Sequence, residues 1–196
     1  VGRPLPETVD EFVRESAVVV VGVGAGNDGG FYPPPQTSLQ YTTYYLRVIG
    51  YLKDETGRRA PFLKILAPGG FLNGGQKADA PLPYLEAGRR YLLYLRPNRG
   101  LDWGNLGHTS SPIGRGDEYW TSGRGGGLWW EEEGRLVGYV DPPTHWGLPF
   151  KVGVLPWPDY LPFGQAVQRA VQAVERERRG VPLVPRPYEP LTFLND

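Results

Sequence analysis

The chain has 196 residues, and its 21 basic and 21 acidic side chains give a formal net charge of zero at pH 7. This balance argues against nucleic acid as a partner, and no apolar run reaches the roughly 20 residues that a transmembrane helix requires. Cysteine is absent, which excludes disulfide bonds, and a chain of this length can bury a hydrophobic core of its own.

Methionine is also absent, and the sequence begins at Val1. Because translation needs an initiator, we expect a processed chain that reaches the cell surface or the extracellular space after removal of a signal peptide. The loss of both oxidisable sulfur side chains suits such an exposed protein. Together with the 21 prolines, it also suits a thermostable one.

The first half of the chain predicts one short helix followed by strands. Thr8 and Glu11 have the spacing of a capping box, and the apolar residues after them share one face, which predicts a helix over Thr8–Ser16. Runs of β-branched, aromatic and alternating apolar residues predict strands at Ala17–Val23, Leu39–Leu52, Pro61–Ala67 and Arg89–Arg96. Glycine and proline clusters predict loops at Gly24–Gln36 and over most of 71–88.

The second half predicts a long loop, a hairpin, a helix and a tail. Leu101–Gly127 is glycine-rich and is expected to be a loop, and 141–162 is expected to be irregular. A hairpin of Leu128–Glu133 and Arg135–Val140 is expected to turn at Gly134.

A helix is expected at Phe163–Arg179, capped at its C-terminal end by Gly180. Its apolar stripe is formed by Phe163, Val167, Ala170, Val171 and Val174. Four prolines keep Val181–Asp196 extended.

Short strands in sequence order, with a helix at either side, favour a mainly β fold over a doubly wound one. We expect a small antiparallel barrel or sandwich. Residues 1–180 are interpreted as the domain, and 181–196 as an extended C-terminal arm.

Several strings within Phe12–Pro97 carry a resemblance to a known pattern. They are Ser16–Gly22, Tyr44–Val48, Tyr51–Lys53, Ala67–Gly70 and Ala87–Leu95. Exported, mostly uncharacterised bacterial proteins have similar strings, and their order resembles the netrin-like modules of protease inhibitors and complement proteins. The resemblance implies an OB-like, five-stranded barrel. It does not imply metalloprotease inhibition, because Val1 stands where those inhibitors need an N-terminal cysteine.

Residue types suited to catalysis or metal binding occur without a supporting arrangement. Gly24–Gly29 matches a phosphate-binding glycine pattern, but prolines follow where a helix should begin, so a hairpin loop is favoured over a dinucleotide site. His108 and His145 could serve a zinc site, and Asp28 or Asp117 a calcium site, but the regular ligand spacings are missing. No cofactor or metal is therefore predicted.

Two hypotheses of hydrolase activity also have little support in the sequence. His108, Ser110 or Ser111, and Asp117 are the residue types of a hydrolytic triad, but they lack a nucleophile elbow. Glu131 and Glu133 next to Trp129 and Trp130 have the residue types of a glycosidase site. A solvated hairpin end is the favoured alternative, and we predict that the chain is not an enzyme.

All six tryptophans lie within Leu101–Trp157, among many glycines. Three interpretations stay open for them: a subunit interface, a second small core built by the loops, and a sugar-binding platform. In the tail, apolar residues and prolines fall on alternate positions, as in an arm that pairs with a neighbour. The candidate interface residues are Trp103, Trp120, Trp129, Trp130, Trp146, Trp157, Leu183, Leu191 and Phe193.

These observations lead to two functional hypotheses. The first is an exported structural protein that self-associates at the cell surface, as a filament or another homopolymer, through tryptophan-rich loops and a terminal arm. The alternative is a secreted netrin-like or OB-like module that binds a protein or glycan partner.

Overall fold

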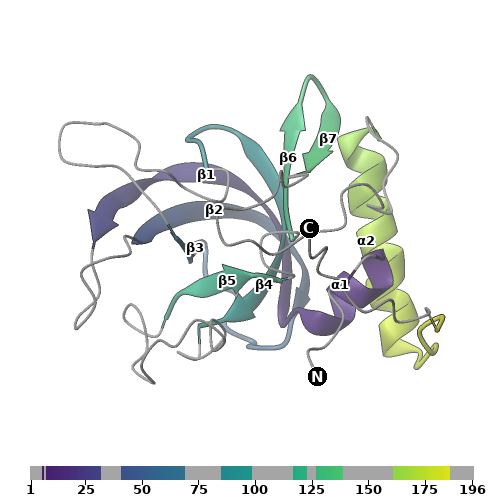
Figure 1. Cartoon of the computed structure of the whole chain (residues 1–196). Helices are drawn as coiled ribbons and strands as arrows, with labels where there is room; N and C mark the ends of the chain where they lie inside the picture. Colours follow the sequence, from purple (N-terminus) through teal and green to yellow (C-terminus); the bar gives the residue numbers. More distant parts are fainter. Residues whose placement is uncertain are drawn as a thin grey trace, which may run out of the picture.

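The structure is a computed structural model, and it describes residues 6, 8–31, 41–68, 85–98, 117–122, 127–138 and 161–185. Two helices and seven strands lie in this part of the chain (Figure 1). In chain order they are α1 (Val9–Glu15), β1 (Val18–Phe31), β2 (Tyr41–Asp54), β3 (Phe62–Pro68), β4 (Arg90–Pro97), β5 (Tyr119–Thr121), β6 (Leu128–Glu132), β7 (Arg135–Gly138) and α2 (Phe163–Arg178).

Five strands close into a barrel in the order β1-β2-β3-β5-β4, because β1 also pairs with β4. The β3–β5 pairing is parallel and the other four pairings are antiparallel. This closed arrangement confirms the mainly β, OB-like barrel expected from the sequence. The strands β5 and β6 pair with successive parts of β4. Leu95 of β4 pairs with Thr121 of β5, and Leu93 of β4 pairs with Leu128 of β6.

The core has two layers. One fills the barrel and consists of Val18, Val20, Tyr44, Leu46, Leu63, Ile65, Leu85, Tyr91, Leu93, Leu95, Tyr119 and Leu128. The other lies between the sheet and the helices and consists of Phe12, Val13, Val19, Val21, Leu92, Tyr94, Trp129, Leu136, Leu161, Phe163, Ala166, Ala170, Ala173 and Val174. Because successive strand residues point to opposite faces, β1 supplies alternate valines to the two layers.

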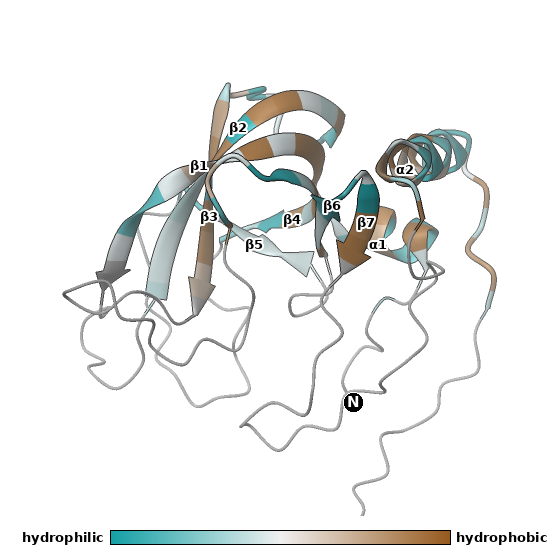
Figure 2. Cartoon of the chain, turned by 90° about the horizontal axis from the view of Figure 1, so that it is seen from above, coloured by the Kyte–Doolittle hydropathy of each residue, from teal (hydrophilic) through white to brown (hydrophobic). Residues whose placement is uncertain are grey.

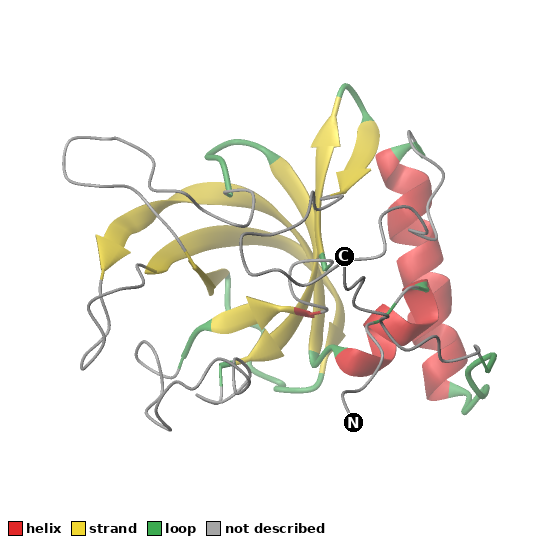
Figure 3. Ribbon diagram, viewed as in Figure 1, coloured by secondary structure: helices red, strands yellow, loops and turns green. Residues whose placement is uncertain are grey.

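Both helices lie on one side of the barrel (Figure 3). The Thr8 hydroxyl accepts the Glu11 N–H at 3.2 Å, so α1 begins with the expected cap. The helix α2 turns an apolar side toward β7 and α1 and a hydrophilic side outward (Figure 2). Lys53, buried on β2, joins the layers: its Nζ donates to the Val13 carbonyl at 2.8 Å and lies 2.9 Å from the Glu177 carboxylate.

The β6–β7 hairpin turns at Glu133 and Gly134, as predicted. Both residues have positive φ angles, 50° and 77°, the backbone signature of a type I′ turn. The free side of β7 is covered, because Leu136 N–H donates to the Leu161 carbonyl at 2.7 Å and Phe163 N–H donates to the Gly134 carbonyl at 3.0 Å.

Three predictions about elements were wrong. The segment predicted as a loop from Gly24 belongs to β1 as far as Phe31, because pairing with β2 outweighs the weak strand propensity of its glycines. Within the predicted loop Leu101–Gly127, Tyr119–Thr121 forms β5 between β3 and β4. Val171 is 41% exposed, because the buried side of α2 is formed by Ala166, Ala170, Ala173 and Val174, and Val171 lies outside that stripe.

Candidate functional site

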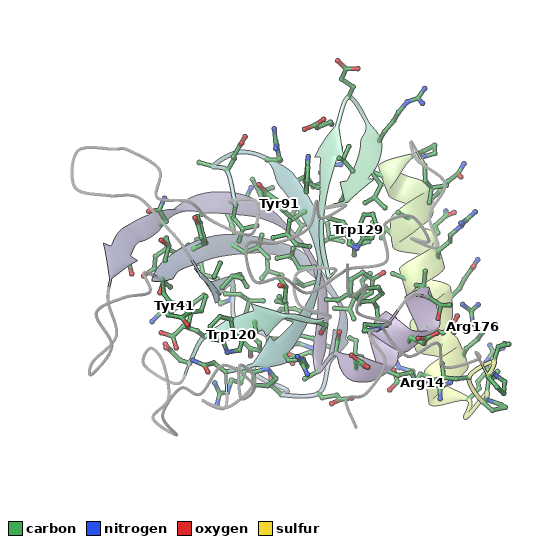
Figure 4. The ribbon with its side chains drawn as sticks, viewed as in Figure 1. Arg14, Tyr41, Tyr91, Trp120, Trp129 and Arg176 are labelled. Carbon is green, nitrogen blue, oxygen red and sulfur yellow. The ribbon has the colours of Figure 1, made fainter. Side chains whose placement is uncertain are left out.

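Trp120 and Trp129 lie in the core, with 5% and 3% of their surfaces exposed. Trp120 donates its indole N–H to Asn98 Oδ1 at 3.0 Å and contacts the Tyr41 ring edge-on, with 6.0 Å between ring centres (Figure 4). Trp129 packs in the layer between the sheet and the helices. Burial therefore corrects the interface assignment for these two side chains, which lie on strands within the core of the domain and not in a separate core built by loops.

Trp130 lies at the surface within a network of charges. Its indole N–H donates to Glu132 Oε1 at 2.9 Å, and the Arg89 guanidinium lies 6.0 Å from the centre of its ring system. This geometry permits a cation–π contact. Of the three tryptophans in the described ranges, Trp130 alone is partly exposed, and it also packs against the barrel core.

The glutamates of the hairpin are engaged by arginines. Glu131 Oε2 lies 3.1 Å from Arg90 Nη1, and Glu132 Oε1 lies 3.7 Å from Arg89 Nη2. As neighbours along β6, Glu131 and Glu132 point to opposite sides of the strand, and Glu133 lies in the turn. The geometry does not bring two carboxylates together across a substrate, as glycoside hydrolysis requires.

The other residues considered for chemistry have structural partners or lie outside the described residues. The Asp28 carboxylate accepts the Tyr45 hydroxyl, and Asp117 forms an ion pair with Lys64 at 2.7 Å. Gly24–Gly29 lies within β1, and the chain directly after it continues as strand to Phe31. His108, His145, Ser110 and Ser111 lie outside the described residues, among which no group of three or more His, Asp or Glu side chains could hold a metal ion.

Five of the candidate interface residues also lie outside the described part of the chain. They are Trp103, Trp146, Trp157, Leu191 and Phe193. Their interface role stays a prediction. Leu183 is described and is 38% exposed.

Leu183 belongs to the apolar segment 181–185, which follows α2 and is exposed throughout. Val181 is 40% exposed and Val184 is 83% exposed. The segment leads away from the barrel (Figures 1 and 2). Exposed apolar side chains that follow one another in an extended segment are available for contact with another molecule.

The base of this segment is fixed at the end of α2. Gly180 has a φ of 71°, its N–H donates to the Glu177 carbonyl at 3.0 Å, and the Val181 N–H donates to the Arg176 carbonyl at 3.0 Å. This is the Schellman arrangement. The Arg14 guanidinium, from α1, donates to the Val181 carbonyl.

Ion pairs fix the end of α2 to α1 and to the barrel. Arg176 makes two hydrogen bonds to the Asp10 carboxylate, at 2.7 and 2.9 Å, and these bonds raise the pKa of Arg176 above its ordinary value. Glu177 on the next position binds Lys53 of β2. Sequence reasoning did not identify these anchoring residues, because their partners lie more than a hundred positions away in the chain.

Comparisons of the chain with models of protein families, with curated proteins and with solved structures found no match. The resemblance to netrin-like modules therefore stays a prediction. Separately, none of the helices in the described ranges is long and apolar enough to cross a membrane.

Proposed function

We propose that the chain is a non-enzymatic, exported assembly protein and that segment 181–185 binds a neighbouring copy. The observation that carries this proposal is the combination of exposed apolar side chains with a fixed base. Val184 is 83% exposed, so it has the most surface to bury among the apolar residues of the segment. Full burial of an aliphatic side chain of this kind contributes about 1.5–3 kcal/mol to the free energy of association.

The anchoring at α2 lowers the cost of that contact. A free tail loses conformational entropy when it docks, whereas a segment whose first residues are already held has less to lose. The contacts of Arg14, Arg176 and Gly180 therefore act as a preorganised base. A tail that binds a surface elsewhere on the next copy makes a heterologous contact, which extends into a filament unless the rotation closes a ring.

The test compares the full chain with a chain truncated after Gly180 and with Val184→Asp. Sedimentation velocity over a range of protein concentrations, with electron microscopy of the same samples, measures assembly. We expect the full chain to form oligomers or filaments and both variants to remain monomeric. Val171→Asp is the matched control, because it places the same charge at another exposed valine, on α2, and should leave assembly unchanged.

A monomeric full chain at all concentrations would contradict the proposal, as would assembly that survives truncation. The second candidate function is a secreted module that binds a different protein. The observation that favours it is an exposed surface on β2 and β3 of the barrel, separate from segment 181–185.

A further inference from the structure

Two large apolar side chains are exposed on the outside of the barrel, away from segment 181–185. Ile49 on β2 is 54% exposed and Phe62 on β3 is 52% exposed. Phe62 lies directly opposite Arg47 in the β2–β3 pairing, and cross-strand partners project from the same face of a sheet. Ile49 follows Arg47 by two positions, with the more buried Val48 between them, so all three side chains share the outer face.

Three arginines lie close to these two residues in the chain or in the sheet. Arg47 is on the same face, and the exposed Arg58 and Arg59 lie in the turn that leads into β3. None of the described residues forms an ion pair with any of the three guanidinium groups. We call Arg47, Ile49, Arg58, Arg59 and Phe62 the arginine surface.

The two acidic residues of the turn, Asp54 and Glu55, have partners other than the three guanidinium groups. Asp54 accepts the backbone N–H of Arg59 at 2.9 Å and that of Thr56 at 3.0 Å, which holds the turn without using a guanidinium. Glu55 binds Lys53 at 3.0 Å. Neither carboxylate is therefore paired with a guanidinium group of the arginine surface, and the three positive charges exceed the two negative charges of the turn.

The turn that carries two of the arginines is itself fixed. The Tyr51 hydroxyl donates to the Ala60 carbonyl at 2.6 Å, and Val48 N–H donates to the Pro61 carbonyl at 2.9 Å. Together with the Asp54 contacts, these bonds hold the backbone of Arg58 and Arg59 in place. A fixed scaffold reduces the entropic cost of binding.

We infer that the arginine surface binds an acidic polypeptide segment that carries an apolar side chain. Guanidinium groups bind carboxylates in a bidentate geometry, and Ile49 and Phe62 would cover the apolar residue between the acids. Arginine and aromatic residues are enriched in protein–protein contacts, where lysine is depleted. The inference does not rest on the assembly proposal, because it uses other residues and another partner.

Other anionic partners fit less well. The Phe62 ring could stack against a sugar, but a sulfated glycan would leave the aliphatic Ile49 uncovered. For a bilayer surface, the apolar side chains should lie at the tip of a loop, but here they come from strands and the turn between the strands is polar. The small surface predicts an affinity on the order of 1–100 µM.

The first experiment selects the partner chemistry directly. A library of random peptides displayed on phage is selected on the immobilised full chain and, in parallel, on the Arg47→Gln/Phe62→Ser double variant. We expect the full chain to enrich peptides in which Asp or Glu flanks a Leu, Ile or Phe, and the double variant not to enrich them. Enrichment of basic or neutral peptides, equal recovery from the double variant, or no enrichment at all would overturn the inference.

The second experiment measures affinity by fluorescence anisotropy, using a labelled peptide of Glu residues around one Leu and one Phe. Arg47→Gln and Phe62→Ser should each weaken binding about tenfold. Arg179→Gln is the matched control, because it removes one exposed arginine elsewhere on the molecule and should change the affinity by less than about twofold. Truncation after Gly180 should leave peptide binding intact, which separates this result from that of the assembly proposal.

Two further probes distinguish the other classes of anion. Vesicles containing phosphatidylserine and a heparin oligosaccharide are titrated under the same conditions. If either binds the full chain more tightly than the acidic peptide and loses binding on Arg47→Gln, the partner is a membrane or a glycan and the inference is wrong. Because Arg47 and Phe62 are exposed, we expect both variants to fold, and circular dichroism with thermal melting verifies it.

Discussion

Gly24 shows how one position in β1 determines the path of a distant loop. Its N–H donates to the Arg89 carbonyl at 2.9 Å, and its carbonyl accepts the Gly88 N–H at 2.8 Å. A Cβ atom at this position would lie 2.0 Å from the Glu86 carbonyl oxygen. The loop before β4 can cross β1 only because position 24 has no side chain.

Replacing Gly24 with Ala should therefore lower the free energy of unfolding by about 1–3 kcal/mol, as expected for an overpacked site. Gly50→Ala is the matched control: it also replaces a strand glycine, but no atom lies within 4 Å of the added Cβ. We expect the control to change the free energy of unfolding by no more than about 1 kcal/mol. Guanidinium denaturation measures both, and equal effects in the two variants would show that space at Gly24 is not the cause.

At the scale of elements, the β2–β3 turn is organised by Asp54. Burial alone would raise the pKa of this carboxyl, but hydrogen bonds from the Thr56 hydroxyl and from the backbone N–H groups of Arg59, Thr56 and Gly57 hold it below its ordinary value of 3.8. Nearby, burial and the Asp54 charge raise the pKa of Tyr51 to about 12. Tyr51 therefore stays protonated at neutral pH and can donate to Ala60.

The lowered pKa of Asp54 predicts a loss of stability in acid. Because the folded state favours the ionised carboxylate, its contribution is fully present above the unfolded pKa of 3.8 and is lost as pH falls through the folded value. Urea denaturation of the wild type and of Asp54→Asn should show a stability difference that is constant above pH 3.8 and shrinks below it. A difference that does not change with pH would exclude this role for Asp54.

Local patterns were enough to predict most elements. The Thr8 cap, the hairpin turn at Gly134 and the end of α2 at Gly180 each follow from residues close together in the chain. The strand extension beyond Gly24 and the short β5 depend on pairing with distant strands, which local propensity does not register. For the same reason, the sequence could suggest both a core and an interface for Trp129 without deciding between them.

On the scale of the whole molecule, the two exposed surfaces differ in chemistry. Segment 181–185 is apolar at its exposed positions and contains no charged residue, whereas the arginine surface carries three guanidinium groups. The chain has no net charge, so long-range repulsion between copies is small. Contacts made by the two surfaces should therefore respond differently to salt.

Raising the salt concentration to about 1 M, where charges are screened within about 3 Å, should separate the two contacts. Assembly through segment 181–185 should persist or strengthen, because burial of apolar side chains does not depend on ion pairing. Binding of the acidic peptide to the arginine surface should weaken at least about tenfold, since its free energy comes largely from charge. Sedimentation velocity and fluorescence anisotropy at low and high salt measure the two. If salt dissolved the assembly, ion pairs would hold the copies together, and the role assigned to Val184 would be wrong.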